Sequence, residues 1–314
     1  MDDPLRMITA IEGVFLRREA RELGYDDKAV IAAMRARLWH RVRHGAYCFA
    51  DDWASQTPEQ RHLTLAKAVL RTTPGPVALS HTTALLALGI AVWGADLRRV
   101  HVTRLDNGAG RVERDVQHHV GLTSDSELVR VGLLPVMNVA RAVLEFASIV
   151  SVESGLVSAD HALHVQACSA DELRARFDTL NHWRGSQKIH VVLHHMDGRA
   201  ESPGETRSRF MFWRQGLPAP ELQFEVYDAN GVLIATTDFA WPEHRVFGEF
   251  DGRVKYGRYL RVGEEAGDAV FREKRREDLV RAITGGAFGR LVWEDLRHPA
   301  ETAERFRNLL RRAA

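Results

Sequence analysis

The segment Thr236–Gly252, TTDFAWPEHRVFGEFDG, decides the fold that we predict for this chain. It contains two strand-like runs joined through Trp241-Pro242, with Asp238 in the first run and Glu249 and Asp251 in the second. Side chains two residues apart on a strand point to the same face, so Glu249 and Asp251 are expected to lie together.

The residues around these acids make both faces of the second run apolar, as in the central strand of a sheet. Carboxylates brought together in such a place repel one another and lose hydration, a cost that a divalent cation offsets. Mg²⁺ prefers a few carboxylates plus water, and it can activate that water for attack on a phosphodiester. We therefore predict a Mg²⁺ site that includes Asp238, Glu249 and Asp251.

The elements expected around this segment follow the order helix, three strands, helix, strand, helix. Asn230-Gly231 is a strong hairpin signal between the first two strands. The expected ranges are a helix from Ser202 to about Gln215, strands at Glu221–Tyr227, Val232–Ala240 and Arg245–Asp251, a helix at Asp268–Ile283, a strand at Arg290–Trp293 and a helix at Pro299–Arg312. This is the order of a restriction-endonuclease-like α/β core.

Four stretches, SPGETRSRF, TTDFAWPEHRVFGEFDG, KRRED and LVWEDL, make this region resemble the PD-(D/E)XK nuclease superfamily. Within it, the region resembles the branch similar to very-short-patch-repair endonucleases. The resemblance implies that Asp238 is the first metal-binding aspartate and Glu249 the second acid. It also implies that Glu205 is the helical glutamate that some members add, although Glu205 also stands where a capping box favours glutamate.

The sequence departs from that superfamily at Asp251, which occupies the position of the superfamily's lysine. Two alternatives follow. Asp251 can be a further metal ligand, or the missing cation can be supplied by Lys255 or Lys274. Lys255 lies in DGRVKYGRYLR, whose basic residues suit a phosphate backbone. Asp238 and Asp251 can also be read as residues of turns.

Residues 8–49 predict a winged helix-turn-helix. A helix at Leu16–Leu23 is expected to end at Gly24, and Asp26 or Asp27 can cap a second helix from Lys28 to about Arg37. The apolar residues of this second helix are expected on one face, and they are Val30, Ile31, Met34 and Leu38. Two strand runs about a glycine follow in residues 38–49.

Four arginines and no acid occur between residues 29 and 49, a balance that suits a phosphate-facing surface. The stretches HRVRHGAYCF and ALSHTTALLALGI resemble the winged-helix head of AbiE-type antitoxins. That resemblance implies promoter binding and a toxin-like protein partner. It places Arg35 and Arg37 on or beside the recognition helix and Arg41 and Arg43 in the wing. The alternative is that these arginines are only solvated.

The fold class that we predict is α+β and multidomain. Its parts are a winged-helix head (1–50), a mainly helical connecting region (51–199) and a nuclease-like domain (200–314). Within the connecting region, a short pair of strands is expected between Val100–Arg104 and Val116–Val120. The isolated Cys48 and Cys168 form no zinc-binding spacing, and neither a signal peptide nor a membrane segment is recognisable, so we expect a bacterial cytoplasmic protein.

The function expected from these features is DNA binding by a protein with a nuclease-type C-terminal domain, with Mg²⁺-dependent hydrolysis of DNA as its activity. A second hypothesis is a transcriptional regulator, an antitoxin-like repressor that keeps the nuclease fold without catalysis. A third is a partner in a toxin–antitoxin pair that acts through protein contacts.

Overall fold

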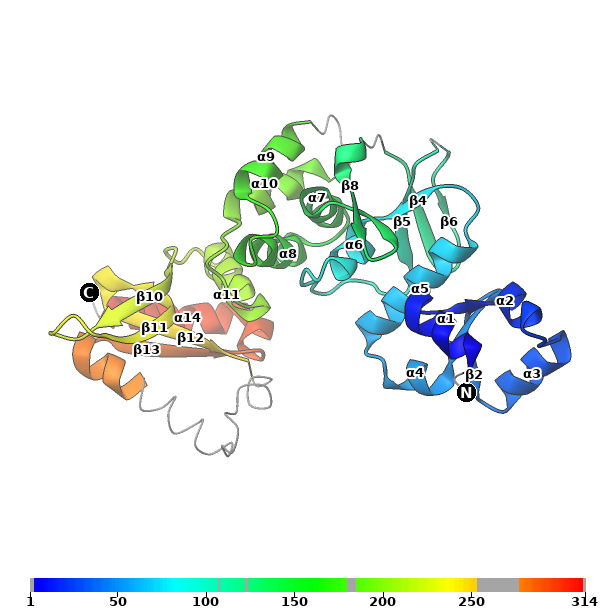
Figure 1. Ribbon diagram of the computed structural model, residues 1–314. Helices are drawn as coiled ribbons and strands as arrows, with labels where there is room; N and C mark the ends of the chain where they lie inside the picture. Colours follow the sequence, from blue (N-terminus) through cyan, green and yellow to red (C-terminus); the bar gives the residue numbers. More distant parts are fainter. Residues whose placement is uncertain (1–2, 107, 122–123, 180–184, 253–276, 313–314) are drawn as a thin grey trace. The chain divides into compact units, whose positions relative to one another are not determined.

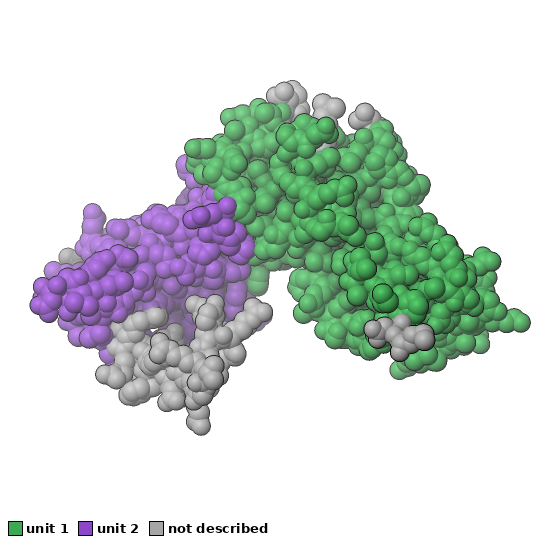
Figure 2. Space-filling model, in the orientation of Figure 1, with its two compact units in different colours: residues 1–158, 167–193 green, residues 159–166, 194–314 purple. Residues whose placement is uncertain are grey.

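The computed structural model describes residues 3–106, 108–121, 124–179, 185–252 and 277–312. In these residues the chain is mixed α/β with three sheets. It divides into two compact units (Figure 2): unit 1 is Met1–Ser158 with Ala167–Leu193, and unit 2 is Ala159–Gln166 with His194–Ala314. The head predicted at 1–50 thus shares one unit with most of the region predicted to connect it. No helix in the described residues is long and apolar enough to cross a membrane.

The head consists of a helix, a strand, two helices and a hairpin. Its elements are α1 (Pro4–Glu12), β1 (Phe15–Leu16), α2 (Arg17–Glu22), α3 (Asp27–Arg35), β2 (Trp39–Arg43) and β3 (Ala46–Phe49), and its sheet has the order β1-β3-β2. The predicted cap of α3 is confirmed, because Asp26 Oδ1 accepts the N–H of Ala29 at 2.8 Å. The hairpin predicted about Gly45 is also confirmed.

Two apolar residues of the head are not where the helical pattern predicted them. Ile31 is 50% exposed and Leu38 is 62% exposed, although both were expected on the buried face with Val30 and Met34. The reason is that α3 ends at Arg35. Leu38 therefore lies beyond the helix, and Ile31 lies about 100° around the helix from the buried Val30.

The rest of unit 1 contains a six-stranded sheet of order β6-β7-β5-β4-β9-β8. Residues 51–199, predicted to be mainly helical, thus contain a sheet in addition to their helices. The elements in this region are α4 (Ala50–Ser55), α5 (Pro58–Thr72), β4 (Val77–Leu79), α6 (His81–Ala87), β5 (Val100–Arg104), β6 (Arg111–Val112), β7 (Val116–His119), β8 (Leu128–Val131), β9 (Leu134–Met137), α7 (Val139–Ile149), α8 (Val152–His164), α9 (Ala170–Asp178) and α10 (Ser186–His195).

Strands β4, β6, β8 and β9 of this sheet escaped prediction because they are short. A run as brief as Val77–Leu79 carries too little periodicity to be told from part of a buried helix. The pair expected between residues 100–104 and 116–120 does form, but β5 and β7 are parallel rather than a simple hairpin.

Unit 2 holds a four-stranded sheet of order β10-β11-β12-β13. Only β12 and β13 are parallel. The elements are α11 (Pro203–Arg214), β10 (Glu221–Tyr227), β11 (Leu233–Trp241), β12 (Val246–Asp251), the helical residues 277–284, β13 (Ala287–Val292) and α14 (Pro299–Arg312).

Helices cover both faces of this sheet (Figure 1). On one face, Phe212 of α11 and Phe306 of α14 pack with Phe250 of β12. On the other face, Val280 packs with Phe247. The predicted central position of β12 is therefore confirmed. The helix expected at 268–283 is seen only from residue 277, because residues 253–276 lie outside the described part.

Candidate functional site

Asp238 and Glu249 stand opposite each other on two central strands of unit 2. The ladder between β11 and β12 pairs Phe239 with Gly248 and is recorded no further in that direction. One residue beyond that pair lie Asp238 on β11 and Glu249 on β12. Residues opposite each other in antiparallel strands direct their side chains to the same face, so these two carboxylates are neighbours.

The same row of residues continues into the two outer strands. Glu249 is in register with Arg290 of the parallel strand β13. On the other side, Gln223 of β10 falls opposite Asp238, between two recorded pairs of the β10·β11 ladder. We call Gln223, Asp238, Glu249 and Arg290 the polar row. The polar row crosses a sheet whose neighbouring residues are largely apolar.

Asp238 explains why the ladder stops at this row. Its Oδ2 accepts the backbone N–H of Phe250 at 2.7 Å. A side-chain carboxylate thus takes a strand N–H that a backbone carbonyl would otherwise accept. The bond fixes the position of Asp238 against β12.

The expected common face of Glu249 and Asp251 is confirmed. Both follow Phe247 at intervals of two residues, while Phe250 belongs to the opposite face. Glu249 is only 5% exposed. Asp251 is near the edge of the site, where its Oδ2 lies 3.5 Å from Nη1 of Arg290. A cation, the guanidinium of Arg290, therefore accompanies Asp251.

Glu205 is buried at the beginning of α11 and has the contacts of a capping residue. Its Oε1 accepts the hydroxyl of Ser202 at 2.7 Å, and its Oε2 accepts the N–H of Glu201 at 2.9 Å. Its Oε2 also accepts a bond of 3.0 Å from Nε2 of Gln223. Glu205 is thus tied both to the helix end and to the polar row. Gln223 has a φ of +51°, a strained value for a residue within a strand.

In the described residues, one group of three side chains is positioned to hold a metal ion, and it is not made of these acids. It consists of His81, His101 and His119 in unit 1. Glu205, Asp238, Glu249 and Asp251 are not gathered in that way. Two further residues of the prediction, Lys255 and Lys274, lie outside the described part of the chain.

The arginines predicted to contact DNA differ in exposure. Arg35, Arg37 and Arg41 are exposed at the end of α3, just after it, and on β2. Arg43, in contrast, is only 16% exposed and its Nε lies 3.3 Å from Oδ2 of Asp115. The charge of Arg43 is thus already balanced within unit 1.

Several residues of interest were not found from the sequence. Gln223 and Arg290 belong to the polar row only through the register of the strands. For Arg290, that register joins β13 to β12, which lies more than 30 residues earlier in the chain. The three histidines come from separate elements. A signal did exist, because His101 and His119 lie on the two runs that the sequence predicted to pair.

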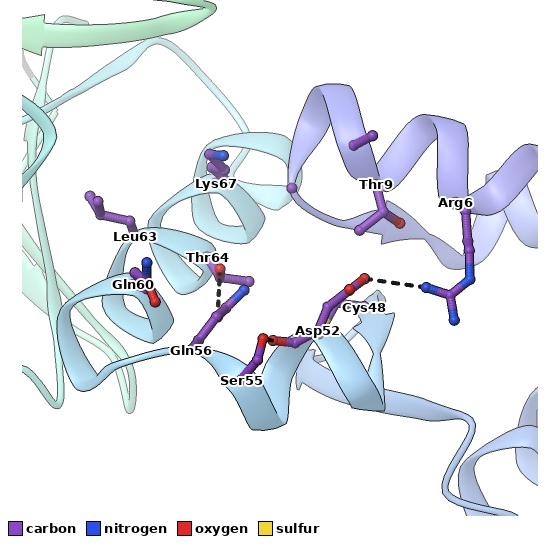
Figure 3. A pocket seen from close by; sticks show the side chains of 12 residues that line it. Arg6, Thr9, Cys48, Asp52, Ser55, Gln56, Gln60, Leu63, Thr64 and Lys67 are labelled. Carbon is purple, nitrogen blue, oxygen red and sulfur yellow. Dashed lines mark hydrogen bonds and ion pairs between the residues drawn. The ribbon is translucent and has the colours of Figure 1, made fainter. Parts of the chain in front are cut away.

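A cavity of about 730 Å³ lies between α1, α4 and α5 in unit 1 (Figure 3). Arg6 lines it and binds Asp51 at 2.8 Å, and Lys67 lines it from α5. Burial raises the pKa of the lining Cys48 thiol to about 12, so this thiol is protonated at neutral pH and is a poor nucleophile.

Comparison with known proteins adds relatives without a described activity. No family model matches the chain. Two uncharacterized proteins of Mycobacterium tuberculosis, MT2308 and Rv2248, are each 28% identical to it over 236 residues, which is 74% of this chain and 83% of theirs. The crystal structure of the RV2827C protein from Mycobacterium tuberculosis aligns with a TM-score of 0.40 and 14% identity. That alignment covers 65% of this chain and 78% of the other. So remote a likeness says nothing about function.

Proposed function

We propose that unit 2 is a nuclease-type domain that hydrolyses phosphodiester bonds of DNA with bound Mg²⁺. The observation that carries the proposal is the pair Asp238 and Glu249, which face each other on central strands where the ladder between them stops. The order of helices and strands in unit 2 also agrees with a restriction-endonuclease-like core. Its resemblance to the PD-(D/E)XK superfamily supports the same reading.

The donor set of the site fits a hard, oxygen-preferring cation. Asp238, Glu249 and Asp251 would hold Mg²⁺, and Glu205 would act from the end of α11. When bound, the ion would lower the pKa of a coordinated water and neutralise charge on the phosphate. The protein holds the acids in position. For Asp238, the backbone N–H of Phe250 does this by donating a hydrogen bond to the carboxylate.

Arg290 is the described residue that best replaces the missing lysine. It is in register with Glu249 and 3.5 Å from Asp251. A guanidinium remains charged at any physiological pH and binds phosphate oxygens through two parallel bonds, so it can stabilise charge on a phosphate. It would not act as a general base. Lys255 stays a predicted alternative.

The head of unit 1 is the proposed DNA-binding part. Its order of elements agrees with a winged helix-turn-helix, in which the second helix of the motif enters the major groove. Arg35 and Arg37 lie at and just beyond the end of α3, and Arg41 lies on the hairpin. All three are exposed, so they can reach phosphates.

Cleavage of supercoiled plasmid by the full chain tests the enzymatic proposal. We expect nicking with Mg²⁺ or Mn²⁺, none with chelator, and loss of nicking in Asp238→Asn and Glu249→Gln. Glu225→Gln is a matched control, because Glu225 is an exposed acid of the same sheet. If wild type fails to nick DNA, or if the two variants nick as fast as the control, the proposal is wrong.

A second function, sequence-specific repression without cleavage, is favoured by one observation. The four acids are not gathered around a common point, and Asp251 already has Arg290 as a counter-charge. Gel shifts with the upstream DNA distinguish the two. Chelator-insensitive binding that Arg35→Ala abolishes, without any cleavage, would support the repressor. A toxin-like protein partner stays a prediction, and co-purification from the native host would test it.

A further inference from the structure

Three histidines from separate elements meet in unit 1. His81 is the first residue of α6, His101 lies on β5 and His119 ends β7. Their ligand atoms all lie within 4.8 Å of one another. We call these residues the histidine cluster. Strand register explains part of the meeting, because β5 and β7 are adjacent and parallel, with Thr103 opposite His119.

We propose that the histidine cluster binds a Zn²⁺ ion, or a similar transition-metal cation, through three imidazole nitrogens. Imidazole is a preferred ligand of such ions, and three histidines with one open position are a known kind of zinc site. Zn–N bonds of about 2.0–2.1 Å place tetrahedral ligands about 3.4 Å apart, so the nitrogens need only small adjustments to reach a shared ion.

The three rings contact one another directly. Nδ1 of His101 and Nε2 of His119 are 2.9 Å apart and share a hydrogen bond. The rings of His81 and His119 stack with centroids 3.7 Å apart. Such close packing requires that the imidazoles repel one another little. They are therefore available as neutral ligands.

The pKa shifts of the three histidines agree with neutral imidazole rings. Burial lowers the pKa of His101 to about 3 and that of His119 to about 4. Burial and the neighbouring imidazoles also lower the pKa of His81 well below its ordinary value. At neutral pH the rings carry lone pairs, so a metal ion would displace few protons when it binds.

The backbone holds His81 in a strained conformation. Its φ is +50°, the left-handed region that non-glycine residues seldom adopt. The N–H of His81 donates to Oε2 of Glu145 at 3.1 Å, and the same oxygen lies 3.5 Å from its ring Nδ1. Carboxylates beside metal-binding histidines commonly fix ring orientation. Glu145 is itself held by Arg141 at 2.8 Å.

The cluster opens on a cavity of about 640 Å³, lined by His81, His119, Glu145 and Thr103 among others. Thr103 Oγ1 is buried and has no hydrogen-bond partner among the described residues. A buried hydroxyl left unsatisfied is costly and usually has a missing partner. A water or small anion on the fourth position of the ion would supply one.

Metal binding by the full chain tests this site. We expect zinc retained after gel filtration to fall by one ion per chain in His101→Gln and His119→Gln, with affinity at least about 100-fold weaker, the upper range for loss of supporting residues. His118→Gln is the matched control, because it precedes His119 on β7 and points to the other face. Equal zinc content in all variants, or no zinc in wild type, would overturn the proposal.

A second measurement needs no variant and covers the case in which a substitution prevents folding. Co²⁺ added to wild type should give the visible absorption of a four-coordinate nitrogen site. Zn²⁺ should protect His81, His101 and His119, but not the exposed His164, from acylation by diethyl pyrocarbonate. Equal labelling of all four with and without zinc would show that the cluster only packs. The result is independent of whether unit 2 cleaves DNA.

Discussion

The histidine cluster of unit 1 and the acids Asp238, Glu249 and Asp251 of unit 2 are both groups of potential metal ligands, but they are built in opposite ways. The histidines come from three elements, and their nitrogens are already gathered within 4.8 Å. The acids come from one hairpin-like segment, and they are not gathered to that degree. Asp238 binds a backbone N–H instead, and Asp251 lies beside Arg290.

The charge of the ligands accounts for the difference. Neutral imidazoles can stack and hydrogen-bond with one another, so three of them pack together at little electrostatic cost. Carboxylates repel one another and each needs a compensating donor, such as the N–H that Asp238 accepts or the guanidinium beside Asp251.

The largest expected effect separates the two sites by function. Glu249→Gln should slow Mg²⁺-dependent cleavage roughly 100-fold or more, the scale of losing one group that stabilises transition-state charge. The same variant should keep its zinc ion in unit 1. Plasmid nicking and zinc content measured on one preparation check both expectations.

Glu225→Gln controls for the loss of a carboxylate from the same sheet. If Glu249→Gln lost zinc as well as cleavage, the two sites would not be separate, and the comparison above would fail.

The sequence predicted the three acids of unit 2 better than the histidine cluster because the signals of the acids are local. The bounds of β10 and α14 agree with prediction, since the Asn230-Gly231 turn and Pro299 mark them. Spacing of two residues placed Glu249 and Asp251 on one face. Asp238 and Glu249 come to lie opposite each other once β11 and β12 pair as neighbouring strands.

The remaining features depend on pairing between segments far apart in the chain. Arg290 joins the row only because β13 runs parallel to β12, and no local pattern reveals that partner. The sheet of unit 1 has strands of two to five residues, too short for periodicity to identify. His81 follows a short strand and begins an apolar helix, so nothing in its surroundings marks it as a ligand.

A smaller effect concerns the support of the polar row. A Cβ at Gly204 would lie 2.0 Å from Cε1 of Phe250, whose N–H holds Asp238. Gly204→Ala should therefore destabilise unit 2 by about 1–3 kcal/mol, the usual cost of overpacking. It should also reduce cleavage without changing zinc binding. Urea unfolding measures the loss of stability.

The double variant Gly204→Ala, Phe250→Leu supplies the control, because a smaller side chain makes room for the added methyl. The loss of stability in the double variant should be smaller than the sum of the losses in the two single variants. Strict additivity would show that contact with Phe250 is not the cause.

A finer test compares two arginines of one strand in the head. Arg41→Gln should weaken DNA binding and lower the slope of log affinity against log salt by about 1, as expected for one lost phosphate contact. Arg43→Gln should leave that slope unchanged, because Arg43 already pairs with Asp115. Fluorescence anisotropy at several salt concentrations measures both. Equal slopes in the two variants would contradict this assignment.

The smallest effect is the response of the metal-free protein to acid, which sharpens the contrast between neutral and charged ligands. The ordinary pKa of histidine is 6.5, whereas burial lowers that of His101 to about 3 and that of His119 to about 4. As pH falls through 6.5, the unfolded chain takes up protons that the folded chain cannot, so stability is lost below pH 6.5. Between pH 7 and pH 6 the loss should be about 0.7 kcal/mol per histidine.

Urea unfolding in the presence of chelator measures this loss of stability, with labelling of the buried Cys48 as the signal from unit 1. The double variant His101→Gln, His119→Gln retains the nearby His62, His118, Glu145 and Arg141, so only the contribution of the two rings is removed. An acid response as steep in that variant as in wild type would mean that the cluster is not the source, and the argument from neutral ligands would lose its support.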